Sequence, residues 1–137
     1  MDEAERRALD EMRRYARQAR SWAREGGARW SEDGKTVAAV AHVVGQVGEL
    51  ARRVSTATRA SHPDVQWAPI TGMRDRIFHD YGHLDRDVLE ETVRRDLREL
   101  DRQLAAILGA PEGRPTRSAA RPPSPRRATP RVRPPRP

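Results

Sequence analysis

The chain has 137 residues, no cysteine and a formal net charge of +7, which indicates a single domain and excludes disulfides and thiolate chemistry. The charge is uneven, because residues 111–137 hold eight arginines and one acid, whereas residues 1–110 hold 19 basic and 19 acidic side chains. The composition therefore excludes a globally basic nucleic-acid-binding domain, and an RNA site in residues 1–110 must come from a local cluster of arginines.

Apolar residues at alternating spacings of three and four predict two long helices. The first covers residues 2–25 and ends at Gly26 and Gly27. The second is predicted over residues 34–60, where a continuous seam consists of Val37, Val40, Val44, Val47, Ala51 and Val54. Such a seam requires a partner helix, and Gly45 and Gly48 would allow a neighbouring helix to approach closely.

The second half of the folded part is predicted to contain shorter elements. Residues 61–70 form a loop in which Trp67 plugs the core, and a short third helix follows over residues 70–80. The last helix is expected to begin near Asp87, which with Glu90 fits a capping box, and to end at Gly109. No segment has a strand pattern. The fold class predicted is all-α, an up-and-down bundle of four or five helices.

Residues 111–137 are predicted to form a disordered arginine- and proline-rich tail, because they contain nine of the eleven prolines and almost nothing to bury. The domain organisation expected is a helical domain over residues 1–110 followed by this tail. No apolar run approaches the roughly 20 residues of a membrane span, and the acidic start lacks the apolar core of a signal peptide. We therefore expect a cytoplasmic protein without membrane contact.

A compact motif, Arg74-x4-His79-x-Tyr81, carries the residues best suited to chemistry. The guanidinium of Arg74 can hold and neutralise a phosphate, and the imidazole of His79 can move protons near neutral pH as general acid or general base. On an ideal helix Arg74 and His79 are about 140° apart. Their convergence would need a distorted helix end or a second copy of the chain, and this geometry favours a dimeric site.

Three charged neighbours complete the candidate site. Arg76 is three residues before His79 and would share its helical face, whereas Asp75 and Asp80 are more naturally ion-pairing partners of the nearby arginines than catalytic groups. All three are candidates for supporting the site or contacting RNA. His79, Asp80 and His83 are too close in sequence for a tetrahedral metal set, so neither a metal nor another cofactor is expected.

From about residue 6 to residue 108 the chain resembles the HepT-like toxins of the HEPN (higher eukaryotes and prokaryotes nucleotide-binding) superfamily. The matching segments, in order, are VGELA at 47–51, HPDVQW at 62–67, ITGMRDRIFHDY at 70–81 and TVRRDL at 92–97. The chain departs from the family pattern in GHL at 82–84, where an aromatic and a glycine are more common, and in its glycine-rich turn at 26–34.

The resemblance implies a helical bundle that forms a homodimer, with two Arg-x4-His motifs facing each other across a cleft. It also implies a metal-independent endoribonuclease toxin that cleaves tRNA or mRNA, with Arg74 and His79 at the catalytic positions. The implied partner is an antitoxin, a minimal nucleotidyltransferase of the MntA kind, which transfers AMP to Tyr81. Two alternatives stay open: a noncatalytic helical partner of a nucleotidyltransferase, and an RNA-binding module that uses the basic tail.

Overall fold

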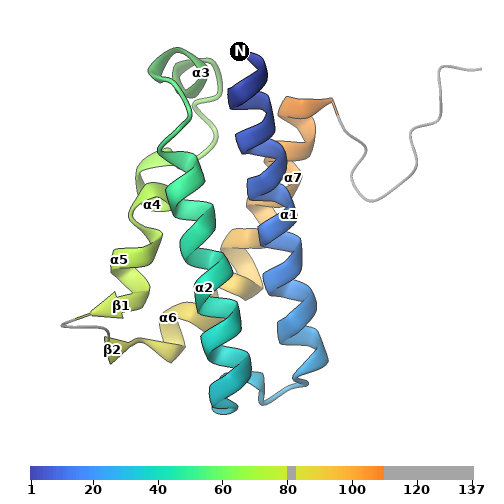
Figure 1. The fold of residues 1–137 in the computed structure, drawn as a ribbon, viewed down its shortest axis with the longest axis vertical. Helices are drawn as coiled ribbons and strands as arrows, with labels where there is room; N and C mark the ends of the chain where they lie inside the picture. Colours follow the sequence, from blue (N-terminus) through green and yellow to red (C-terminus); the bar gives the residue numbers. More distant parts are fainter. Residues whose placement is uncertain (80–82, 110–137) are drawn as a thin grey trace, which may run out of the picture.

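A computed structural model describes residues 1–79 and 83–109, and it confirms the all-α up-and-down bundle (Figure 1). The elements in chain order are α1 (Glu3–Glu25), η1 (Trp30–Glu32), α2 (Gly34–Ala51), α3 (Thr56–Ser61), α4 (Trp67–Thr71), α5 (Met73–Ile77), β1 (Phe78–His79), β2 (His83–Leu84), α6 (Arg86–Glu91), η2 (Thr92–Asp96) and α7 (Leu97–Leu108). The chain passes along the bundle four times, as α1, α2, α4–α5 and α6–α7. None of the described helices is both long and apolar enough to cross a bilayer.

Helix α1 begins and ends where the sequence predicts. The Asp2 side chain accepts a hydrogen bond from the Glu5 backbone N–H, and the Glu5 side chain accepts one from that of Asp2, which completes a capping box. The predicted apolar face is buried against α2 and α7. Gly26 is the C-cap of the helix, and only glycine fits there because a Cβ would lie 2.7 Å from the Trp30 Cβ. Gly27 follows with a positive φ of 79°, a conformation that glycine adopts readily.

The valine seam of α2 is buried within this single chain. Each of its six members is at most 4% exposed, and α1 covers much of the helix. The seam therefore has its partner helix already, and it is not a free surface for a second copy of the chain. Gly48 allows the close approach that the sequence predicts, whereas Gly45 faces a side chain at an ordinary contact distance.

The prediction that the second helix continues to residue 60 is wrong. Helix α2 ends at Ala51, and the separate helix α3 is capped by Ser55, whose hydroxyl accepts a hydrogen bond from the Thr58 N–H. Arg59 turns back and donates to the carbonyl oxygens of Ala51 at 2.7 Å and Val54 at 3.1 Å. These bonds tie α3 to the last residue of α2 and to the turn that follows it.

The last pass of the chain also differs in detail from the prediction. Its N-cap is Asp85, not Asp87, because the Asp85 carboxylate accepts a hydrogen bond from the Val88 N–H at 3.0 Å. The helix then widens into a π-helical turn, η2, before continuing as α7. The buried Thr92 at the start of this turn donates its hydroxyl to the Val88 carbonyl at 2.7 Å.

Candidate functional site

The segment that carries the motif is held against α2 by a small-residue contact. A Cβ at Gly48 would lie 3.1 Å from the Ile70 carbonyl oxygen and 3.8 Å from the Met73 Cβ. Ile70 and Met73 are buried, and Trp67 is anchored as predicted, since it is 7% exposed and its Nε1 donates to the His62 carbonyl. The backbone of α4 and α5 is therefore fixed close to the axis of α2.

The third helix ends earlier than the sequence predicts. Helix α5 stops at Ile77, and Phe78 is extended, with φ −103° and ψ 110°. His79 lies in the two-residue strand β1, which pairs antiparallel with β2, so that His79 is opposite His83. The prediction that no strand occurs is thus wrong at this point, and the helical-face relation between Arg76 and His79 does not exist. The Asp85 N–H donates to the Ile77 carbonyl at 2.7 Å and draws the chain out of the helix.

Arg74 lies on α5 with its aliphatic part against α2. Its Cδ is 3.9 Å from the position a Cβ would take on Gly45, an ordinary contact distance, so the arginine stem lies over this turn of α2. The residue as a whole is exposed. The helix between Arg74 and His79 is interrupted, because α5 ends at Ile77, and Arg74 does not line the depression around His79.

His79 is paired with an acidic residue that the sequence analysis did not single out. Its Nε2 is 3.5 Å from Asp85 Oδ2, with the two side chains 50% and 33% exposed. The other oxygen of the same carboxylate caps α6. A carboxylate beside one ring nitrogen orients an imidazole. Asp85 could have been found from the sequence as an N-cap, because an aspartate that caps a helix accepts a hydrogen bond from the N–H three residues later, here that of Val88.

The other predicted supporting residues are not gathered around His79. Arg76 Nη2 is 3.9 Å from Asp96 Oδ2 of η2, and both side chains are about half exposed. Asp75 is exposed. Asp80 and Tyr81 lie outside the described residues.

A shallow depression of about 410 Å³ surrounds the imidazole, lined by His79, His83, Leu84, Asp85, Arg86 and Asp87. It lies at the end of the bundle away from α3, where β1, β2 and the start of α6 meet (Figure 1). Among residues 1–79 and 83–109, no group of three or more His, Asp or Glu side chains is arranged to hold a metal ion. The depression is open to solvent on the side of His79.

The family described as “Ribonuclease HepT-like” matches residues 7–107, which is most of the chain and runs from the first turns of α1 almost to the end of α7. The chain belongs to the HepT-like ribonuclease family. This confirms the resemblance found in the sequence, and the matched region contains both Arg74 and His79.

Individual relatives agree with this membership. The chain is 32% identical over 62 residues to “Putative RNase TTE0752” of Caldanaerobacter subterraneus, which covers 45% of this chain and 55% of that protein. It is 32% identical over 68 residues to “Probable ribonuclease HepT” of Thermococcus cleftensis, covering 50% and 62%. It therefore spans between half and two thirds of the length of these relatives. No solved structure matches the chain.

Proposed function

We propose that this protein is a metal-independent endoribonuclease, the toxin of a toxin–antitoxin pair, with His79 and Arg74 as its catalytic residues. The observation that carries the proposal is the exposed imidazole of His79 with Nε2 beside the Asp85 carboxylate, 3.5 Å away. The pair lies in a chain of the HepT-like ribonuclease family.

The chemistry requires only proton transfer and charge stabilisation. The ribose 2′-hydroxyl attacks the adjacent phosphorus, the bond to the 5′-oxygen breaks, and a 2′,3′-cyclic phosphate forms. His79 serves as the base that takes the 2′-hydroxyl proton or as the acid that gives a proton to the leaving 5′-oxygen. Arg74 neutralises the charge that develops on the phosphorane oxygens. Asp85 positions the imidazole.

A homodimer would complete this site. The depression around His79 is open, and the two proton transfers call for two groups on opposite sides of the phosphate. A second copy of the chain placed across the open side would supply the second His79 and a second Arg74. Because the valine seam is already covered, the α5–β1 region is the surface that we assign to dimerisation.

The antitoxin of the pair would be a nucleotidyltransferase that attaches AMP to Tyr81. Tyr81 is two residues from His79, so a bulky anionic adduct there would obstruct the site and repel RNA phosphates. The co-expressed partner and ATP should add the mass of one AMP to the protein, and Tyr81→Phe should abolish the addition. An unshifted mass, or a shift that persists in Tyr81→Phe, excludes this step.

The ribonuclease proposal is tested by incubating total RNA with purified protein in EDTA. Wild-type protein should cleave it and leave cyclic phosphate ends, whereas His79→Ala and Arg74→Ala should each lose at least about a hundredfold in rate. If the wild type leaves RNA intact while it still binds the nucleotidyltransferase, the noncatalytic partner role replaces this proposal. Activity that persists in His79→Ala removes His79 from the mechanism.

A further inference from the structure

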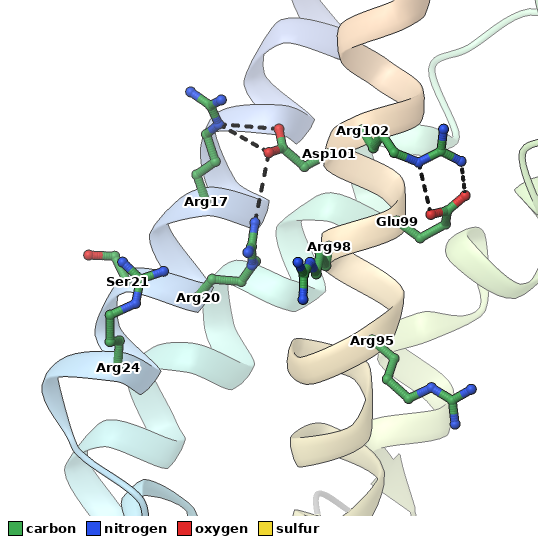
Figure 2. A pocket seen from close by; sticks show the side chains of 9 residues that line it. All are labelled: Arg17, Arg20, Ser21, Arg24, Arg95, Arg98, Glu99, Asp101 and Arg102. Atoms are coloured by element: carbon green, nitrogen blue, oxygen red, sulfur yellow. Dashed lines mark hydrogen bonds and ion pairs between the residues drawn. The ribbon is translucent and has the colours of Figure 1, made fainter. Parts of the chain in front are cut away.

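A groove of about 600 Å³ between α1 and the η2–α7 segment is lined mostly by arginines (Figure 2). Its arginines are Arg17, Arg20 and Arg24 on α1, and Arg95, Arg98 and Arg102 on the opposite wall. Glu99, Asp101 and Ser21 are the other lining residues. All nine side chains are polar or charged, so the groove is unsuited to an apolar ligand, and its cations outnumber its carboxylates by four.

The carboxylates of the groove are already engaged. Asp101 is 2.8 Å from Arg13, 3.2 Å from Arg17 and 3.8 Å from Arg20, so one acid is shared among three arginines of α1. Glu99 pairs with Arg102 on its own helix. By contrast, Arg24 and Arg98 are exposed, and neither makes a side-chain hydrogen bond or ion pair with any residue that the structure describes.

The basic surface extends beyond this groove toward η1. Arg20, Arg24 and Arg98 also line an adjoining hollow there, which adds Arg94. On the other side, Arg95 lines both this groove and a depression in which Arg76 is accompanied by Asp64, Asp96 and Glu99, so the excess of cations ends there. The arginine surface therefore covers the groove and its continuation toward η1.

We propose that this arginine groove binds the sugar–phosphate backbone of the RNA substrate at nucleotides away from the cleaved bond. The inference rests on the proposed ribonuclease function, and it locates the basic RNA-binding surface on a face of residues 1–110, whose overall charge is neutral.

The chemistry of the groove favours a phosphate backbone over an acidic protein surface. Guanidinium groups bind phosphate oxygens in a bidentate fashion, and two facing rows of them can follow successive phosphates. A protein partner of comparable affinity would need apolar or aromatic anchors, and the groove offers none. The pairing of Asp101 with three arginines of α1 also fixes the two walls relative to each other, so the site is formed before RNA arrives.

The test compares two double variants of the full chain that remove the same charge. Arg24→Gln/Arg98→Gln changes the two unpaired groove arginines. Arg7→Gln/Arg53→Gln changes two exposed arginines outside the groove. Both variants retain the arginine-rich tail, so its contribution cancels. Matching urea midpoints establish that both are folded. Binding of a fluorescent 20-nucleotide RNA is measured over a salt series in the His79→Ala background, and cleavage is measured in the otherwise wild-type chain.

If the groove binds RNA, the Arg24→Gln/Arg98→Gln variant should bind the RNA about tenfold more weakly than the control variant does. The slope of log K against log salt should also become shallower by roughly 1.4, which is about 0.7 for each lost phosphate contact. KM for long RNA should rise, whereas cleavage of a dinucleotide, which is too short to reach the groove, should not change. Equal RNA affinity of the two variants overturns the inference. If, in addition, only the groove variant loses binding to poly-L-glutamate, the groove binds an acidic protein surface instead of RNA. RNA binding that depends on the groove without any cleavage refutes the ribonuclease function instead.

Discussion

Two glycines one turn apart in α2 provide a sharp test of how the motif segment is held. Gly45 and Gly48 both have ordinary helical backbone conformations, so alanine at either position should gain up to about 1 kcal/mol from helix propensity. Their surroundings differ. A Cβ on Gly45 would be 3.9 Å from Arg74 Cδ, an ordinary contact with a flexible side chain, whereas one on Gly48 would be 3.1 Å from the Ile70 carbonyl oxygen.

The steric cost therefore falls on Gly48→Ala alone. A Cβ–oxygen distance of 3.1 Å is tighter than nine in ten real Cβ contacts, and the contact is with backbone, so α4 must move away from α2. Overpacking of this kind costs about 1–3 kcal/mol. We expect Gly45→Ala to be more stable than wild type by about 0.5–1 kcal/mol and Gly48→Ala to be less stable than Gly45→Ala by about 2 kcal/mol.

Urea unfolding followed by far-ultraviolet circular dichroism measures the difference. With a slope of about 2 kcal/mol per molar urea, the two midpoints should be separated by roughly 1 M. Gly48→Ala should also cleave RNA more slowly, because the displaced α4–α5 segment carries Arg74. Equal midpoints for the two variants would refute the claim that close backbone approach at Gly48 positions the motif.

Three further variants test individual contacts. Asp85→Asn keeps a good N-cap for α6 but removes the negative charge facing the imidazole, so kcat should fall by about tenfold or more with little change in KM or in the unfolding midpoint. Glu5→Gln should destabilise the protein at pH 7. Hydrogen bonds from Ser55 lower the pKa of Glu5 from 4.5 to about 2, so the stabilisation is complete above pH 4.5 and is lost as the pH falls toward 2, and the two urea midpoints should converge there. Asp101→Asn removes the carboxylate that faces the nearly buried Arg13, which should cost about 2 kcal/mol in unfolding free energy and lower the urea midpoint.

The long helices could be predicted because their apolar period directly reflects burial. Every member of the predicted α1 and α2 faces is buried. The end of α2 could not be predicted in the same way, since Val54 continues the period and is 4% exposed although the helix has already ended at Ala51. Beyond Ala51 the chain turns, and Arg59 bonds back to the carbonyls of Ala51 and Val54; a period of apolar residues contains no information on such a bond.

The candidate site, like the long helices, could be predicted only in part. Residue type alone identified Arg74 and His79 as candidates, because few side chains combine phosphate binding with proton transfer. The end of the helix that carries them was predicted wrongly, because the chain leaves the helix at Phe78 and Ile77 bonds to Asp85, eight residues away. Helix periodicity describes only residues three or four apart, so it cannot predict a hydrogen bond between residues that are eight apart.

Asp85 links the fold to the proposed chemistry, because one residue makes three separate contacts. Its N–H bonds the Ile77 carbonyl at the end of α5, its Oδ1 caps α6, and its Oδ2 faces His79. Serine could cap α6 but could not reach the imidazole, and asparagine could do both without the charge. Only aspartate both begins the helix and places an anion beside the ring. The position of His79 is therefore set by where α6 starts, and α6 in turn is anchored by the fully buried Leu89. Loss of that anchor should disturb the site even though Leu89 contacts no reacting group.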